Sequence, residues 1–303
     1  MSGCIEEPLQ AGHGGQRGRQ SLTGRQSLTR CHGRGGARRR SPARSGSYLA
    51  PPDRLMGARI VAMHATSEFV ALTSVRIGSA RFRVGSWQGR NDVAYLAPVT
   101  AASTLTPPVL ASVRDRLLHQ GFKSVITAAV GPPARHWLVD DGFSIRSELT
   151  ALSLDLEASG GLEHPGGRTR RARRRDLDGV LRVDAGAFGP FWQLDAEGLH
   201  EARTATPSSR WRVIRSPEVT AYSITGRAGP TGYLQRLAVA TRSQGLGLGT
   251  ILVLDALNWL QRRGAQTALV NTPPDNERAL ALYQRCGFRV EPDRLAVLHR
   301  DLT

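Results

Sequence analysis

The chain has 303 residues, enough for two domains of ordinary size, and its 40% hydrophobic content is enough to form their cores. No window approaches the ~20 consecutive apolar residues of a membrane span, and the amino terminus lacks the apolar stretch of a signal peptide. We therefore expect a cytoplasmic protein with no membrane partner. The formal net charge of +16 suggests nucleic-acid binding. However, Lys123 is the only lysine, and this bias toward arginine is more typical of a GC-rich coding sequence, which disfavours a nucleic-acid partner.

The cysteines exclude two further classes of protein. Cys4, Cys31 and Cys286 are far apart and odd in number, so they indicate neither a disulfide framework nor a zinc site. We expect a reducing compartment and no metal.

Residues 1–55 are rich in Gly, Arg and Ser, and they repeat the sequence GRQSLT at 18–23 and 24–29. Such a segment buries too little apolar surface to offset its ordering entropy, so we predict that it is disordered. An upstream extension translated in the gene model, with Met56 as the natural start, would have the same composition.

After this segment, one pattern of elements occurs twice. Residues 116–156 parallel residues 259–302: each has a helix end, a Gly, a strand, a Pro-Pro pair, a short helix, a Gly-Phe pair and a final strand. We predict two copies of one α/β module, at 58–156 and 176–303, joined by a linker at 157–175.

Apolar periodicity and turn residues predict the elements of the second copy in chain order. Asp176 can cap the first helix. The predicted elements are helices at 176–188 and 195–206, strands at 210–215, 219–227 and 232–240, a helix at 248–263, a strand at 266–272, a helix at 275–285 and a strand ending near Leu302.

The helix predicted at 248–263 is amphipathic, so we expect one of its faces to pack on a sheet. Its apolar face carries Leu248, Leu252, Ala256, Trp259 and Leu260, and its polar face carries Asp255, Asn258, Gln261 and Arg262.

Three alternate glycines, Gly245, Gly247 and Gly249, lie between the strand predicted at 232–240 and the start of this helix. Glycine lets backbone N–H groups approach a ligand, and the helix terminus adds a positive dipole end, so a phosphate or pyrophosphate is the natural ligand. No lysine follows Gly249, which excludes a P-loop. Thr250 stands where a dinucleotide fingerprint has its third glycine, and several strands precede the loop, so that class also fits poorly.

The spacing Arg242-x-x-Gly245-x-Gly247 resembles the pyrophosphate loop, [Q/R]-x-x-G-x-[G/A], of the GNAT superfamily of acyl-CoA-dependent N-acetyltransferases. The segment Asn276–Phe288, NERALALYQRCGF, is similar to the same family's second signature, and the two motifs stand in the family's order. The resemblance covers about 176–303. It implies an α/β (α+β) fold of two GNAT-like modules, each a mixed, largely antiparallel sheet flanked by helices, and acetyl-CoA as co-substrate.

The resemblance also implies roles for individual residues. Tyr283 matches the tyrosine that protonates the departing CoA thiolate in many family members, so it is the expected catalytic acid. The strand before the loop would bind the pantetheine arm, the loop would hold the pyrophosphate, and Asn276 and Ala279 would lie along the pantetheine. The expected cofactor-binding residues are Leu237, Ala238, Val239, Arg242, Ser243, Gln244, Gly245, Leu246, Gly247, Leu248, Gly249, Thr250, Asn276 and Ala279.

Simpler interpretations stand beside these roles. Tyr283 could be core packing, Asn276 a helix cap and Arg242 a solvated charge. Cys286 is expected to be a small buried hydrophobe rather than a nucleophile. The aromatic stretch 188–195 could form the wall of an acceptor cleft or anchor a loop in the core.

Two features depart from the family pattern. Family members often carry a glutamate where this chain has Gln235, which cannot accept a proton. The other candidates for a base are Asp195, Glu197 and His200, although a solvated helix face is the simpler explanation for each.

The first copy departs further. The segment Val99–Thr106 aligns with the glycine loop but contains no glycine, and Leu138 takes the position of Tyr283. We therefore expect a degenerate first copy and a single acetyl-CoA site in the chain.

The sequence thus predicts an N-acetyltransferase that moves an acetyl group directly from acetyl-CoA to an amine in a ternary complex, as a monomer or homodimer. The acceptor could be a protein N-terminal α-amine, a small-molecule amine or an amino sugar. A tandem arrangement is also found in mycothiol synthase, but no acceptor motif points to that substrate. The alternative is a catalytically silent CoA-sensing or nucleic-acid-associated module.

Overall fold

The computed structural model describes residues 72–160 and 168–302. The predicted disordered segment and Met56 lie outside the described residues. We call residues 72–156 the first half and residues 168–302 the second half.

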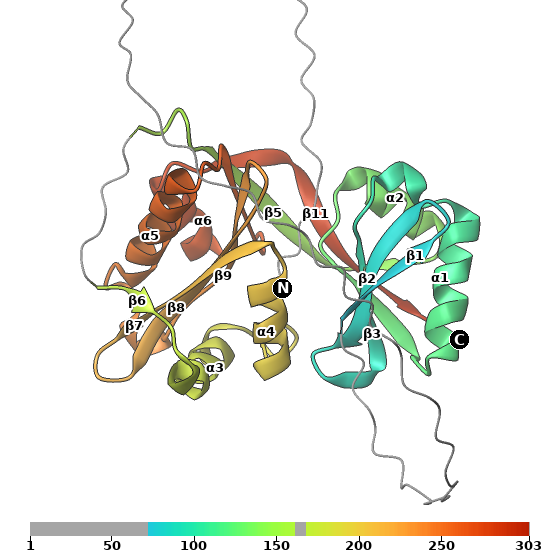
Figure 1. The fold of residues 1–303 in the computed structure, drawn as a ribbon, viewed down its shortest axis with the longest axis horizontal. Helices are drawn as coiled ribbons and strands as arrows, with labels where there is room; N and C mark the ends of the chain where they lie inside the picture. The colour runs from blue at the N-terminus through green and yellow to red at the C-terminus, as the bar shows by residue number, and fades with distance from the viewer. Residues whose placement is uncertain (1–71, 161–167, 303) are drawn as a thin grey trace, which may run out of the picture. The chain divides into compact units, whose positions relative to one another are not determined.

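Each half contains three consecutive strands, a helix, a fourth strand, a shorter helix and a last strand (Figure 1). The first half comprises β1 (Thr73–Ile77), β2 (Ala80–Trp87), β3 (Arg90–Pro98), the 3-10 turn η1 (Ala102–Thr104), α1 (Pro107–His119), β4 (Ser124–Thr127), α2 (Pro132–Asp140) and β5 (Ser144–Asp155). The second half comprises β6 (Arg170–Arg171), η2 (Arg174–Asp176), α3 (Leu177–Ala187), α4 (Ala196–Thr204), β7 (Ser208–Arg215), β8 (Val219–Ala228), β9 (Thr231–Val239), η3 (Thr241–Ser243), α5 (Leu248–Arg262), β10 (Thr267–Thr272), α6 (Glu277–Arg285) and β11 (Arg289–Asp301). Every helix and strand predicted for the second copy is present, and β6 occupies part of the predicted linker.

The two halves exchange their last strands. The sheet order is β1-β2-β3-β4-β11-β5-β10-β9-β8-β7-β6, so β11 of the second half pairs with β4, and β5 of the first half pairs with β10. The exchanged strands β5 and β11 also pair with each other, antiparallel. Apolar alternation marks both strands in the sequence but does not specify a distant partner, which is why this exchange was not predicted.

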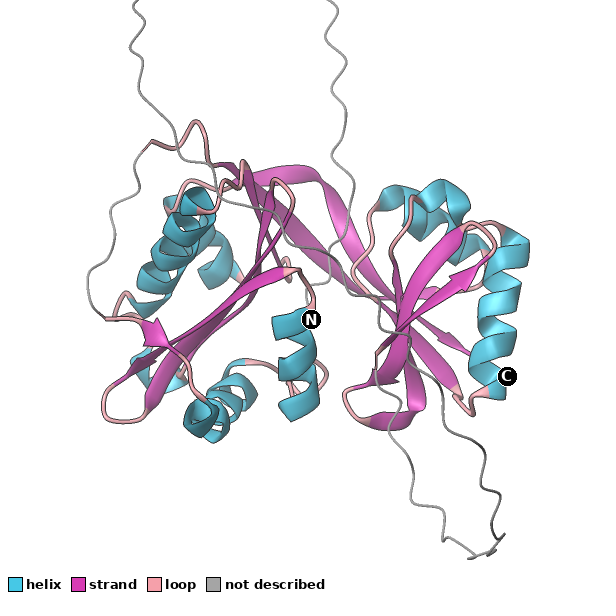
Figure 2. Cartoon of the chain, viewed as in Figure 1, coloured by secondary structure: helices cyan, strands magenta, loops and turns pink. Residues whose placement is uncertain are grey.

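Helices cover opposite faces of the second half's sheet (Figure 2). On one face, α5 and α6 pack with Leu234, Val270 and the first half's Leu152. On the other face, α3 and α4 pack with Val213 and other side chains of β7 and β8. The strands β7 to β9 therefore form a layer between two apolar cores, and β9 carries side chains into both.

Asp255 belongs by periodicity to the polar face of α5, yet it is 1% exposed. Its carboxylate accepts hydrogen bonds from Arg210 on β7 (3.0 Å) and from Thr169 (2.9 Å), and Arg212 lies 3.4 Å away. Burial alone would raise the pKa of Asp255, but the hydrogen bond and charge of Arg210 outweigh it, so the pKa lies below its ordinary value. Asp255 is thus buried against two arginines of β7, while Arg262 on the same face of α5 is exposed.

Asp176 was predicted to cap α3, and that prediction is wrong. Its carboxylate makes no cap hydrogen bond to α3. It accepts instead from Arg170 (2.7 Å), Arg215 (3.2 Å) and the backbone N–H of Arg173 (2.8 Å). The hydrogen bond from Arg170 lowers the pKa of Asp176 to about 2. The residue therefore fastens β6 to β7 rather than starting the helix.

Glu201 on α4 is the exception among the buried acids. It is 7% exposed, and its Oε2 atom has no hydrogen-bond partner within the part of the chain that the structure describes. Burial, reinforced by the charge of Glu197, raises its pKa from 4.5 to about 7.

The strand exchange predicts that a change in β11 destabilises the first half. Leu298 is fully buried in the core beneath α1 and α2, so Leu298→Ala should lower the free energy of unfolding by about 2–5 kcal/mol. Hydrogen exchange should accelerate in α1 and β2, more than 170 residues earlier in the chain. The control on the same strand is Val290→Ala, since Val290 is 48% exposed. Faster exchange confined to the second half would contradict the pairing.

Glu201 predicts a pH-dependent loss of stability. Between pH 4.5 and about 7 the unfolded chain releases the Glu201 proton while the folded chain keeps it, so stability falls as the pH rises. The loss is complete above pH 7 and amounts to about 3 kcal/mol at most. Glu201→Gln removes this titration. In urea unfolding, the free energy of unfolding of the variant should therefore rise relative to that of the wild type between pH 4.5 and pH 8. A difference that is constant with pH would show that Glu201 is ionised in the folded protein.

Candidate active site

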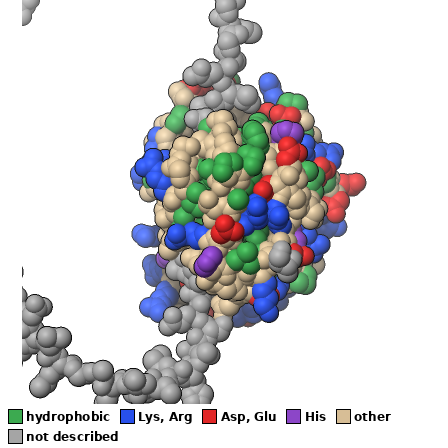
Figure 3. Space-filling view, turned by 90° about the vertical axis from the view of Figure 1, so that its right-hand side faces the viewer, with side chains coloured by type: hydrophobic (Ala, Val, Ile, Leu, Met, Phe, Trp, Pro, Cys, Tyr) green, Lys and Arg blue, Asp and Glu red, His purple; other side chains and the backbone are tan. Residues whose placement is uncertain are grey.

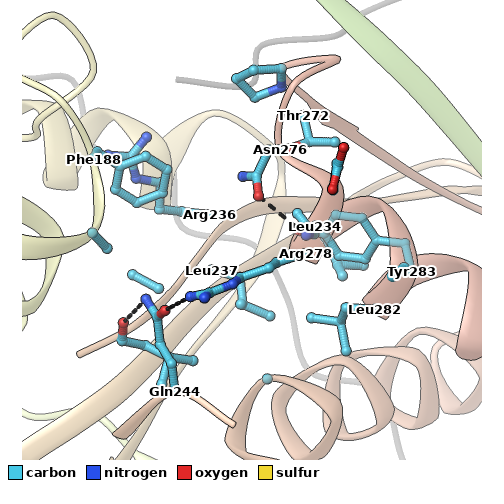
Figure 4. Close-up of a pocket in the computed structure, with 18 of the residues that line it drawn as sticks. Phe188, Leu234, Arg236, Leu237, Gln244, Thr272, Asn276, Arg278, Leu282 and Tyr283 are labelled. Atoms are coloured by element: carbon cyan, nitrogen blue, oxygen red, sulfur yellow. Dashed lines mark hydrogen bonds between the residues drawn. The ribbon is translucent and has the colours of Figure 1, made fainter. Parts of the chain in front are cut away.

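A groove of about 1350 Å³ runs along β9 and between the amino-terminal ends of α5 and α6 (Figure 4). The predicted cofactor residues that line it are Leu237, Ala238, Val239, Ser243, Gln244, Gly245, Gly247, Leu248, Gly249, Thr250, Asn276 and Ala279. Tyr283 lines the same groove, so the structure brings the predicted acid to the predicted cofactor site. Arg242 and Leu246 do not line it.

The groove exists because two neighbouring strands separate. Strand β9 pairs in parallel with β10 only as far as Tyr233 and Leu269. Beyond that point β10 continues to pair with β5 on its other side, while β9 continues to pair with β8. The edge of β9 from Leu234 onward therefore faces the groove with backbone groups that an extended ligand can pair with, as an added strand would.

The three glycines of the loop meet two different requirements. Gly245 and Gly247 have φ of 80° and 74°, a left-handed conformation that side chains disfavour. Gly249 is helical, but a Cβ atom there would lie 2.9 Å from Leu282 of α6, so glycine allows α5 and α6 to approach. The loop is thus fixed in shape and brings α5 close to α6.

The loop delivers unpaired backbone donors to the groove. The first backbone bond of α5 runs from the N–H of Ile251 to the carbonyl of Gly247 (3.1 Å). The N–H groups of Leu248, Gly249 and Thr250 precede this bond and have no partner within the helix. Together with the helix dipole they form a cradle for an anion, which fits the pyrophosphate of coenzyme A.

The basic residues around the loop differ from the expected ones. Arg242 points away from the groove to a solvent-exposed ion pair with Glu218 (3.2 Å). Arg278 and Arg285 of α6 line the groove instead, and Arg278 donates to the side-chain oxygen of Gln244 (2.8 Å). Both arginines lie inside the second signature segment, so their spacing was visible in the sequence although their role was missed.

Asn276 caps helix α6, the simpler of the two roles that its sequence position indicates. Its side-chain oxygen accepts the N–H of Ala279 (3.2 Å), which fixes the first turn of α6. The cap leaves the side-chain amide nitrogen of Asn276 beside the groove.

Tyr283 is 6% exposed and packs edge-to-face on Phe288, with ring centroids 5.8 Å apart. Its hydroxyl has no hydrogen-bond partner among the described residues. Burial, followed by the neighbouring Cys286, raises the pKa of Tyr283 to about 12. The hydroxyl therefore stays protonated at neutral pH and is available as a donor.

The structure separates the candidate bases from the groove. Asp195 caps α4 by accepting the N–H of Gly198 (2.7 Å), and His200 is exposed. Neither they nor Glu197 line the groove. Gln235 does line it, 3% exposed, with its side-chain oxygen unpartnered within the described residues.

The residues of the aromatic stretch 188–195 divide between the groove and a packing contact. Phe188 and Trp192 line the groove, while Phe191 packs on Trp87 of the first half, with ring centroids 5.6 Å apart. The sequence did not predict which of these residues line the groove and which pack against the first half.

Arg236 links this stretch to β9, and sequence reasoning missed it. Its guanidinium donates to both oxygens of buried Asp184 at 2.8 Å and to the carbonyl of Trp192 at 2.6 Å. It also lies 3.4 Å from the centroid of the Phe188 ring. Tyr222 donates its hydroxyl to Asp184, and burial raises the pKa of Tyr222.

The equivalent loop of the first half lacks the features of a phosphate cradle. It forms η1 without glycine, and Leu105 beside it is fully buried. Helix α1 begins with Pro107 and Pro108, which have no N–H to donate. Leu138, which takes the position of Tyr283 in the first half, is fully buried in the core.

Residues 200–288 match the sequence model of the acetyltransferase (GNAT) family, which includes the groove's loop and Tyr283. The mycothiol acetyltransferase of Nocardioides sp. is 27% identical over 258 residues, which cover 72% of this chain and 86% of that protein. N-alpha-acetyltransferase 30 of Schizosaccharomyces pombe is 39% identical over 57 residues, which cover 19% of this chain and 38% of that protein.

Two solved structures share the fold. A tandem GNAT protein from the clavulanic acid biosynthesis pathway superposes with a TM-score of 0.55 at 14% identity, covering 75% of this chain and 81% of that one. An acetyltransferase of the GNAT family from Novosphingobium aromaticivorans superposes with a TM-score of 0.53 at 17% identity, covering 76% and 92%. With the loop, the separated strands and the family match in agreement, residues 200–288 form a domain of the acetyltransferase (GNAT) family, whose co-substrate is acetyl-CoA.

Proposed function

We propose that the protein is an N-acetyltransferase that moves the acetyl group of acetyl-CoA directly to an amine in a ternary complex. The separation of β9 from β10 beyond Tyr233 carries this proposal, since it opens a backbone edge that leads from the phosphate cradle to Tyr283. Leu237, Ala238 and Val239 would pair with the pantetheine arm. The glycine loop, with Arg278 and Arg285, would hold the phosphates.

In this reaction the neutral amine attacks the thioester carbonyl, a C–N bond forms and the C–S bond breaks. The departing thiolate takes a proton from the Tyr283 hydroxyl, the proton that the amine loses passes to solvent, and solvent returns a proton to the tyrosinate. Gln235 cannot accept that proton, but its unpartnered oxygen supports a role in orienting the amine N–H. The groove's own residues thus account for binding and for leaving-group protonation.

Direct transfer is favoured over an acetyl-enzyme because no cysteine lines the groove among the described residues. Cys286 is the one free cysteine among the described residues, and burial raises the pKa of its thiol. It does not line the groove.

We also propose that the chain is a tandem of two copies of this fold and that only the second copy binds acetyl-CoA. The repeated element order and the symmetric exchange of β5 and β11 support the duplication. The prolines at the start of α1 support the loss of the first cofactor site.

A silent CoA-binding module is the second candidate, and the glutamine at position 235 favours it. A nucleic-acid role has weaker support.

Figure 3 shows the face that lies at the right-hand side of Figure 1. On this face basic and acidic side chains are interspersed and do not form a basic patch. No helix among the described residues is long and apolar enough to cross a membrane.

Tyr283→Phe tests the acid role. Since the hydroxyl makes no hydrogen bond within the described residues, its loss should leave stability nearly unchanged and lower kcat by about 100-fold. The KM for acetyl-CoA should stay within a factor of about two. Thiol release from acetyl-CoA with a panel of amines measures both constants.

The matched control is Cys286→Ala, three residues further along at the C-cap of the same helix, which should keep the wild-type rate. An unchanged kcat in Tyr283→Phe would remove the tyrosine from the mechanism. Acetyl-CoA binding without thiol release from any amine would favour the silent module.

A further inference from the structure

The groove has a second end, distinct from its phosphate end. Strands rise about 3.3 Å per residue, so Leu234 lies roughly 17 Å before Val239 along β9. Tyr283 belongs to the same apolar cluster as Leu234. The acetyl group and the incoming amine must therefore meet near Leu234, on the side of Tyr283 away from the glycine loop.

Apolar side chains form much of the wall at this end, beside the polar Gln235, Asn271 and Thr272 of β9 and β10. Phe188 and Trp192 contribute from the segment after α3, and Leu149 contributes from β5 of the first half. Figure 4 shows Phe188 beside Arg236, across β9 from Tyr283. The wall thus combines both halves of the chain.

Within the part of the chain that the structure describes, the one cation in this wall is already neutralised. Arg236 is 5% exposed, and both of its hydrogen bonds to Asp184 are charge-assisted. It also donates to the carbonyl of Trp192 and lies over the ring of Phe188. Arg236 therefore positions the wall and does not offer a charge to an acceptor.

The first half holds the wall from its other side. Gln88, in the turn between β2 and β3, donates its side-chain N–H to the carbonyl of Phe191 (3.0 Å). The ring of Phe191 lies between Trp87 (5.6 Å) and the guanidinium of Arg146 (5.1 Å). Gln88 has φ of 48°, a left-handed conformation held in this tight turn. Wall residues Phe188 and Trp192 are thus fixed between β9 and the first half.

We propose that the acceptor is a primary amine carried on an apolar or aromatic group that packs against Phe188, Trp192 and Leu149. The inference rests on the N-acetyltransferase function proposed above. An apolar carrier gains from leaving water at this wall. An amino sugar would bring several hydroxyls against these three apolar side chains, and each hydroxyl left unpaired there weakens binding.

The test compares acceptors with the full-length protein. Thiol release from acetyl-CoA is measured with phenethylamine, with a short peptide amide whose first residue is phenylalanine, and with glucosamine. We expect kcat/KM for at least one aromatic amine to exceed that for glucosamine by 10-fold or more. The two aromatic arms distinguish a small-molecule acceptor from a peptide N-terminus.

The outcomes separate the two proposals. Glucosamine used as well as or better than both aromatic amines overturns the apolar acceptor and leaves the N-acetyltransferase standing. No thiol release with any amine counts against the N-acetyltransferase itself.

Variants locate the preference. Trp192→Ala should raise the KM for the aromatic amine about 10-fold with little change in the KM for acetyl-CoA, and Trp192→Phe should restore most of the loss. Gln88→Asn keeps a residue that tolerates positive φ but shortens the donor, so it should raise the same KM. Leu118→Ala, on the exposed surface of α1, is the control. Equal losses for aromatic amine and glucosamine in Trp192→Ala would overturn the proposal.

Discussion

The separation of β9 from β10 is the constraint on which the rest of the structure depends. Backbone groups cannot be left unpaired in a dry interior, so two strands part only where something else can pair with them. Here β10 keeps its ladder to β5, β9 keeps its ladder to β8, and the open edge between them faces the groove. The glycine loop and the start of α5 follow directly from the end of β9, which places the phosphate cradle at one end of that edge.

The strand exchange gives the first half a structural role in the second half's groove. Strand β5 completes the second half's sheet beside β10, so the open edge of β9 depends on a strand that the first half supplies. The same strand brings Leu149 to the groove, and the turn at Gln88 holds Phe191. The first half thus acts as scaffold and wall for the second.

Much of the second half could be predicted from the sequence because its signals are local. Periods of two and 3.6 residues mark β7 to β11, α5 and α6, and the motif spacing identifies the loop and Tyr283. What could not be predicted depends on distant partners. Periodicity predicts that Asp255 is a surface residue, because its partner Arg210 lies on a strand far away in the sequence. The partner of β11 and the division of labour between Phe191 and Trp192 likewise depend on contacts across more than 40 residues.

Hydrogen exchange with and without acetyl-CoA tests the central claim most directly. We predict slower exchange at the backbone amides of Gly245–Thr250 and Leu237–Val239 on adding acetyl-CoA, with no change at Val99–Thr106 of the first half. Protection at Val99–Thr106, or none at the glycine loop, would contradict a single cofactor site built on the separated strands.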